Sequence, residues 1–413
     1  MIKALIGNNK NKLVSQSYDG ANVMSGRTAG VQALIKQNYP HAFFVHCYAH
    51  QLNLILSQAA SSNTEVRIFF ANISEITSFF KHSSQRTQVL DEIVKKRLPA
   101  TSATRWNFHS RSIITIHNNK DTLIECLEKI ETSSKQTLTI NQSQAIRMKL
   151  EQSTFNFWLN FFSKIMPHVD ILYSTLQSRM ITADTAKKAV EAFFVEIRKI
   201  RESVDEMNLE ETDDRPKRIK KDTFITRKLA AKEVCDIISS QVSDRFQFNG
   251  HLSIATLFAF EKFKTYIKEF PEEELDNVIS NYPFINRQCL KTELTVIYGR
   301  DDFQTVTKTV DLLGFLLENN LVECFPELSK CLKIIITIPM TSSEAERSFS
   351  CLKRIKTFLR STMCEERLTA LAMLSMEKSL IHDMADFNDK VIDKFSTRKH
   401  RRMEFQFKGT TSQ

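Results

Sequence analysis

Two acidic residues stand in patterns that could serve metal-dependent chemistry. Asp19 ends a short predicted strand in the segment SYDGA, and Glu346 lies in SSEAERSFS at the start of a predicted helix. A carboxylate at a strand end can hold a metal ion at the edge of an α/β sheet, and one on a helix can act as a metal ligand or general base. Each has a plainer explanation, since Asp before Gly is an ordinary turn pair and Ser343 with Glu346 has the spacing of a capping box. On spacing alone, the structural roles are favoured.

A second group of potential ligands lies in the segment HCYAH. Cys47 and His50 are three residues apart, so a helix would place them on one face, where they could share a zinc ion. Zinc requires about four ligands, and no second pair at zinc-finger spacing exists in the chain. The segment therefore predicts a helix start with a buried thiol and a hydrogen-bonded histidine, and no complete metal site.

Two segments could contact nucleic acid. Arg105 and Trp106 are adjacent, and such a pair can stack on a base and contact a phosphate. The alternative, a Trp packed beneath the Arg stem, is favoured by composition alone. A charged stretch at 209–222 is predicted as an exposed mobile loop, because no apolar period survives in it. The stretch could be a nuclear-import signal or a phosphate-contact patch, or it could be an ordinary solvated loop. Its basic residues are Arg215, Lys217, Arg218, Lys220 and Lys221.

The composition predicts how these residues are positioned. The 413 residues include 57 Lys plus Arg against 48 Asp plus Glu, a formal charge of +9 that permits a nucleic-acid partner without requiring one. Only 8 Gly and 8 Pro occur, which favours long helices and excludes collagen-like and low-complexity architectures. Eight dispersed cysteines without a CxxC pair indicate reduced thiols, and no apolar run approaches the roughly 20 residues of a membrane span. We expect a soluble intracellular protein with no membrane partner.

The hydrophobic pattern changes along the chain. Strands are predicted at 13–18 and 42–45, with helices at 31–37 and from 47 onward, an α/β opening. Apolar residues at spacings of three and four then predict a mostly helical block from about 110 to 320, whose aromatic stripes are core. Further helices are predicted from Pro326, from Ser343 and from about 365. The last two of these helices carry more apolar surface than a short domain end hides, which predicts that a partner, or the α/β domain itself, covers it.

The order of these segments carries more information than any one of them. SYDGANVMSG, HCYAHQLNLIL, ATRW and then PMTSSEAERSFSCLKRIKTFLRSTM together resemble the hAT superfamily of DNA transposases, from about residue 13 to 380. The resemblance is strongest to domesticated vertebrate relatives of the zinc-finger MYM type. It implies an α/β but mainly α fold, in which a truncated ribonuclease-H-like domain is interrupted by an all-helical insertion. The implied domains are the ribonuclease-H-like part at 1–109, the insertion at 110–320, the C-terminal dimerisation region at 321–382 and a basic tail at 383–413.

The resemblance also implies roles for the residues already noted. The family uses an Asp–Asp–Glu triad that binds two divalent metals, Mg²⁺ or Mn²⁺, for attack on phosphodiester bonds. Asp19 matches the second Asp and Glu346 the terminal Glu. Cys47 and His50 match a motif beside the active site, and Trp106 matches a tryptophan that stacks on a flipped base.

Residues 1–18 contain neither Asp nor Glu, so the first acid of the triad is missing from this chain. We therefore expect a vestigial site, no bound metal or other cofactor, and no enzyme activity. The opening strands of the fold and the family's N-terminal zinc finger are also expected to be missing.

Three functions remain open from the sequence. The first is a non-catalytic hAT-derived protein of the nucleus that forms homodimers or larger oligomers, with possible DNA binding and no small-molecule substrate. The second is a fragment of an active transposase that lacks its N-terminus, and the third is a helical scaffold without a nucleic-acid role. For the first, the residues expected at the dimer contact are apolar and helical: Phe349, Leu352, Leu368, Leu371 and Leu374.

Overall fold

The chain forms two compact units, residues 1–342 and residues 343–413, in a computed structural model. The structure describes residues 6–7, 9–99, 106–178, 181–207, 217–246, 250–300, 303, 306–357, 360 and 362–398. The predicted mainly α class is confirmed, because the described residues are largely helical and contain two short strands.

The strands open the first unit. The strands β1 (Ser15–Tyr18) and β2 (Phe43–His46) pair in parallel, with Ser15 opposite Phe43 and Tyr18 opposite His46. The 3₁₀ helix η1 (Lys10–Lys12) precedes them, and α2 (Asn22–Ser25) and α3 (Val31–Asn38) form the connection. Parallel strands need such a crossover, and both strands lie where the sequence predicts them. That this pair is a ribonuclease-H remnant stays a prediction.

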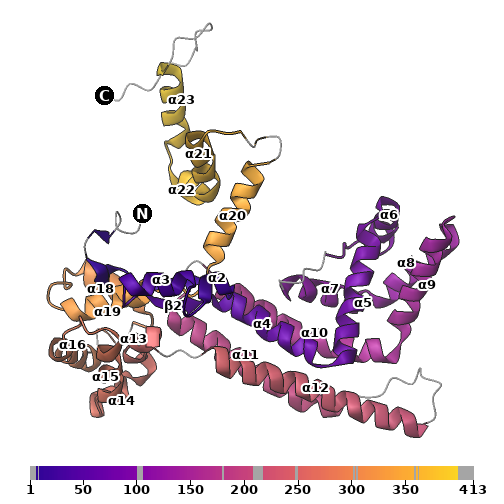
Figure 1. Cartoon of the computed structure of the whole chain (residues 1–413), viewed down its shortest axis with the longest axis horizontal. Coiled ribbons are helices and arrows are strands. Elements are labelled where there is room, and N and C mark those ends of the chain that lie inside the picture. Colours follow the sequence, from indigo (N-terminus) through magenta and orange to yellow (C-terminus); the bar gives the residue numbers. More distant parts are fainter. Residues whose placement is uncertain are drawn as a thin grey trace. The chain divides into compact units, whose positions relative to one another are not determined.

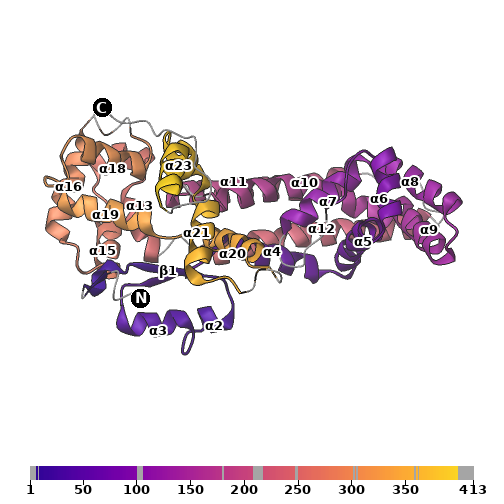
Figure 2. The ribbon, with the colours of Figure 1, turned by 90° about the horizontal axis from the view of Figure 1, so that it is seen from above.

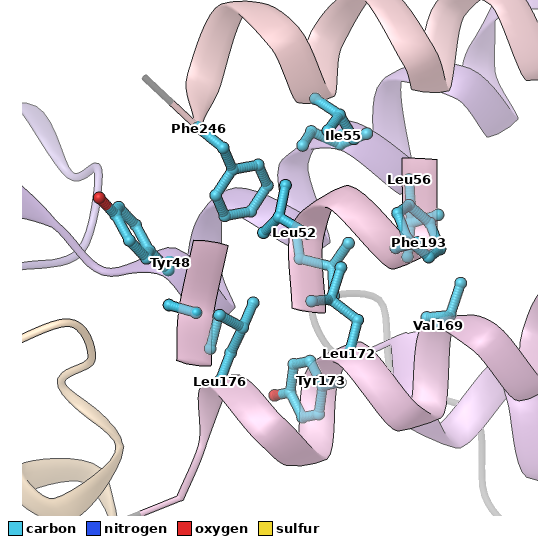
Figure 3. Close-up of a cluster of buried hydrophobic side chains, with 14 of the residues drawn as sticks. Tyr48, Leu52, Ile55, Leu56, Val169, Leu172, Tyr173, Leu176, Phe193 and Phe246 are labelled. Atoms are coloured by element: carbon cyan, nitrogen blue, oxygen red, sulfur yellow. The ribbon is translucent and has the colours of Figure 1, made fainter. Parts of the chain in front are cut away.

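A bundle of long helices forms the middle of the first unit (Figures 1 and 2). It contains α4 (Tyr48–Ser62), α10 (Ser153–Leu176), α11 (Ala183–Ser203) and α12 (Lys217–Arg245), with the short η2 (Val204–Glu206) after α11. Figure 3 shows the core between these helices, where the buried side chains include Leu52, Leu172, Leu176, Phe193 and Phe246. The stripes at spacings of three and four are therefore core.

The bundle is also joined by a polar contact between three helices. The indole Nε1 of Trp158 on α10 donates to Glu65 Oε2 at 3.1 Å, and Nε of Arg227 on α12 donates to the same oxygen at 3.0 Å. The Arg227 side chain is 8% exposed, so its charge depends on this carboxylate for compensation.

Helix α12 begins earlier than the sequence predicts. It starts at Lys217, so residues 217–222 of the predicted loop at 209–222 are helical, and residues 208–216 lie outside the described residues. The segment from Lys217 to Arg245 contains no Gly or Pro, and Lys and Arg are good helix formers. The loss of the apolar period in residues 217–222 therefore does not distinguish a helix from a loop.

Further helices lie at the two ends of the bundle (Figure 2). One end contains α5 (Thr64–Lys81), α6 (Ser84–Ile93), α7 (Trp106–Asn118), α8 (Lys120–Ser133) and α9 (Thr137–Glu151). The other end begins with η3 (Gly250–Leu252), α13 (Ser253–Leu257), η4 (Phe260–Lys262) and α14 (Phe263–Lys268). It continues with α15 (Glu272–Asn281), α16 (Arg287–Gly299), α18 (Thr309–Glu318) and α19 (Pro326–Thr337), the last beginning at the predicted proline.

Helices α16 and α19 cap each other. The buried carboxylate of Glu293 on α16 accepts hydrogen bonds from the backbone amides of Glu327 at 3.3 Å and Leu328 at 2.6 Å, the first turn of α19. In return, Glu327 Oε2 accepts from the backbone amide of Asn286, the N-cap of α16, at 3.2 Å. Helix N-termini leave such amides without intrahelical partners, so the pair stabilises both helix starts.

Replacing Glu293 by Ala is expected to destabilise the first unit by about 1–3 kcal/mol, because two buried amides lose their acceptor. Urea unfolding followed by circular dichroism measures this loss. Glu318→Ala, which removes an exposed carboxylate from α18, serves as the control and should change the midpoint little. Equal midpoints for the two variants would show that the reciprocal caps contribute nothing.

The second unit contains α20 (Ser343–Ile355), α21 (Glu365–Met376), α22 (Lys378–Asp383) and α23 (Phe387–Thr397). Helices α20 and α21 begin where the sequence predicts them. They pack against each other, and the Cys351 thiol donates to Ser375 Oγ at 2.9 Å. Among the described residues of this unit, Cys351 is the only apolar side chain that is buried.

Candidate self-association surface and strand-end site

The SYDGA and HCYAH segments meet at the carboxyl ends of β1 and β2. A methyl group at Gly20 would lie 2.8 Å from Cε1 of His46, so only glycine fits there without displacement of the imidazole. The rings of His46 and His50 stack with centroids 5.4 Å apart. Asp19 Oδ1 accepts from the Ala21 amide at 3.3 Å, the turn contact that the sequence offered as the plainer explanation. The two segments therefore form one local site.

Cys47 joins this site to the residues just before the second unit. Its amide donates to Tyr18 O at 3.0 Å, and its Sγ accepts from the Ser342 amide at 3.3 Å. Sγ also lies 3.6 Å from Thr341 Oγ1, and the Tyr48 amide donates to Met340 O at 3.0 Å. The start of α4 thus holds residues 340–342, a contact that the sequence analysis did not predict.

The described part of the chain contains no candidate metal site. Nowhere in it do three or more His, Cys, Asp or Glu side chains lie together so that they could hold an ion. Asp19 belongs to the first unit and Glu346 to α20 of the second, so their match to the acids of a metal site rests on the family resemblance. No described helix is long and apolar enough to cross a membrane.

The surroundings of His46 strongly shift the pKa of its imidazole. Burial, together with the nearby charges of His50 and Arg245 and against the opposing effect of Asp19, lowers its pKa to about 4. Its Nε2 is buried and has no hydrogen-bond partner in the structure. A charged imidazole would therefore be poorly accommodated at this position.

Acid is expected to destabilise the first unit through His46. Because its folded pKa is below the ordinary 6.5, the unfolded chain takes up the proton first, and stability falls as the pH decreases from about 6.5 to about 4. His46→Gln should flatten the dependence of the urea midpoint on pH across this window. His382→Gln, at an exposed position on α22, should leave the dependence unchanged; the same flattening in both variants would contradict the assignment.

The candidate nucleic-acid residues differ in how far they are described. Trp106 is buried: its Nε1 donates to Ser57 Oγ at 2.9 Å, and its ring packs edge-on against Phe70 at 4.8 Å. Its stacking on a base would require this ring to leave the core. Arg105 and the side chains of the basic cluster lie outside the described residues, although the backbone of the cluster is helical: Lys217, Arg218, Lys220 and Lys221.

The second unit presents apolar side chains to solvent. Phe349 on α20 is 69% exposed and Leu374 on α21 is 50% exposed. The other predicted contact residues, Leu352, Leu368 and Leu371, are partly exposed. All five therefore lie in one small helical unit with little core of its own.

Comparison with known proteins matches residues 293–380 to the hAT family C-terminal dimerisation region. The match starts earlier than the predicted 321. Its first part, 293–342, belongs to the first unit, where Leu294, Leu328 and Leu332 are fully buried. Its second part, 343–380, carries the exposed residues described above.

Two relatives also match over most of this chain. Both are the "52 kDa repressor of the inhibitor of the protein kinase", from Mus musculus and from Homo sapiens, and each is 20% identical to it. The alignments cover 89% and 96% of this chain but 54% and 57% of the relatives, so the chain spans about half their length. The regional match is the firmer finding: residues 293–380 are similar to the hAT family C-terminal dimerisation region.

Proposed function

We propose that this protein is derived from a hAT transposase and that its retained capacity is self-association through residues 343–380. The observation that carries the proposal is the exposure of the large apolar side chains within the matched dimerisation region. The buried half of that region, 293–342, already serves the core of the first unit. Residues 293–342 also expose a few apolar side chains, including Leu317 at 55%. Among the described residues, 343–380 expose more of them and bury one, Cys351, so this is the part that a second copy would cover.

The size of the second unit supports this assignment. Among the described residues of this unit, Cys351 is the one apolar side chain that is buried, so its own core is small, and oligomerisation is a usual remedy for a small core. Four apolar side chains of this unit have at least half of their surface exposed, and all four lie within 343–380: Phe349, Met373, Leu374 and Leu380. A second copy would bury such surface, and each Å² of apolar surface removed from water stabilises the association by roughly 25 cal/mol.

Light scattering coupled to gel filtration, over a series of protein concentrations, tests this proposal on the full chain. We expect a mass of twice the chain mass of 47.7 kDa, or a higher multiple of it, that is retained in moderate salt. A mass of one chain at every concentration would contradict the proposal.

We also propose a nuclear, DNA-associated role, supported by the charge of +9 and by the likeness to proteins named as repressors. Binding of a DNA duplex should weaken steeply with salt, since phosphate contacts release counterions. No binding at ~50 mM salt would favour the helical scaffold instead. Kinship with the zinc-finger MYM type stays a prediction.

We further propose that Asp19 and Glu346 are vestigial and that this chain does not transfer DNA strands. In support, the Asp19 carboxylate is engaged by the turn amide of Ala21. The assay incubates the chain with Mg²⁺ or Mn²⁺ and labelled duplex DNA. Strand cleavage that Asp19→Asn abolishes would instead establish the alternative, an active transposase fragment.

A further inference from the structure

A pocket at the end of the bundle has the chemistry of an anion site. It has a volume of about 670 Å³ and lies among α5, α6, α8 and α9 of the first unit, which Figure 2 shows together. Three of its lining residues are basic: His82, Arg86 and Lys135. No acidic residue lines the pocket. Most of the other lining residues have hydroxyl or amide side chains: Ser83, Gln85, Ser133, Ser134, Gln136 and Thr139.

Arg86 is the most informative of these residues. Its guanidinium is partly buried, lies over the ring of Phe79 at 4.2 Å, and has its pKa lowered by burial. Among the described residues, no carboxylate pairs with it. A desolvated cation without a counter-charge is costly, and an anion in the pocket would supply the missing partner.

The backbone adds positive potential at the same place. Ser83 is the N-cap of α6, and Gln136 is the N-cap of α9, so both helices begin at the pocket wall. Helices of ten and fifteen residues carry partial positive charge at these ends, and their first amides are hydrogen-bond donors. The Gln136 side chain makes no capping hydrogen bond to the amides of α9.

From this juxtaposition we infer that the α6–α9 pocket binds a phosphate group, with Arg86 and Lys135 as its principal cationic partners. The hydroxyls of Ser83 and Ser134, which accept hydrogen bonds from backbone amides, can donate to the phosphate oxygens, and the planar guanidinium of Arg86 suits these oxygens geometrically. The phosphate could belong to a nucleic-acid backbone or to a small phosphate ester, since both present the same group. The inference does not depend on self-association, because all of these residues lie in the first unit.

Calorimetric titration of the full chain with inorganic pyrophosphate tests the inference. We expect binding that weakens about tenfold in Lys135→Gln and further in Arg86→Gln/Lys135→Gln, as charge-assisted hydrogen bonds are lost. Lys188→Gln removes the same charge from an exposed position on α11 and should bind as the parent does. Lys135 is exposed, so its substitution should leave the melting temperature unchanged and report on binding alone.

Competition identifies the source of the phosphate. If a short DNA duplex displaces pyrophosphate from the parent chain, and its own affinity falls in the double variant, the pocket serves a nucleic-acid backbone. If pyrophosphate binds and DNA does not compete, the pocket serves a small phosphate ester. Absence of pyrophosphate binding, or equal affinity in the parent and the double variant, would overturn the inference.

Discussion

Replacing Phe349 and Leu374 together by Asp is expected to convert the self-associated protein to single chains. Each is a large apolar side chain with half or more of its surface exposed, on the adjacent helices α20 and α21. Burial of such a side chain contributes about 1.5–3 kcal/mol, and a carboxylate in its place would have to be desolvated. The substitutions enter both copies, so we expect association to weaken more than about 100-fold.

Light scattering across a concentration series measures this change. The control is Ile171→Asp, which places one such carboxylate on α10 of the first unit at a position that is 65% exposed and outside the matched dimerisation region. The control should keep the mass of the parent. If the double variant keeps the mass of the parent and its helical content, the interface does not lie on α20 and α21.

Replacing Leu52 by Ala is expected to destabilise the first unit by about 2–5 kcal/mol while leaving self-association intact. Leu52 has no exposed surface and lies in the core between α4, α10 and α11 (Figure 3). Its truncation removes buried apolar contacts and leaves a cavity that long, well-packed helices cannot easily fill. Chemical denaturation followed by circular dichroism gives the loss.

A leucine on the surface of the same bundle serves as the control, because it separates the effect of losing a buried side chain from the effect of replacing a leucine. Leu229 on α12 is 61% exposed, so Leu229→Ala should change the midpoint by less than about 0.5 kcal/mol. The native mass of Leu52→Ala should equal that of the parent, because the core of the first unit and the apolar surface of the second are separate features. A monomeric Leu52→Ala protein that is still folded would show that self-association depends on the first unit.

Much of the fold could be predicted because its signals are local. The stripes of α5, α10 and α11 repeat at spacings of three and four, and Pro326 marks the start of α19. The division at residue 342 could not be read from the pattern. Helices α19 and α20 are both amphipathic, but α19 is buried in the first unit and α20 is largely exposed, which depends on tertiary packing.

The candidate site shows the same limit. The sequence predicts a buried thiol at Cys47, and the structure shows that it contacts Thr341 and Ser342, nearly 300 residues later. No periodicity reports such a contact. The residue type of Trp106 is compatible both with stacking on a base and with packing in a core. Its burial against Phe70 shows that in the folded chain it packs in the core. The α6–α9 pocket cannot be read from the sequence, because its basic residues come from two segments about 50 residues apart, which converge only through helix packing.

Cross-linking of mixed isotopic copies tests the central claim, self-association through residues 343–380, most directly. Equal amounts of ¹⁴N- and ¹⁵N-labelled chain are combined, treated with a lysine-specific cross-linker and analysed by mass spectrometry. We expect links between the two isotopes among Lys353, Lys356 and Lys378, which are exposed in the second unit. Mixed-isotope links that are absent, or that join only lysines of residues 1–342, would contradict the account.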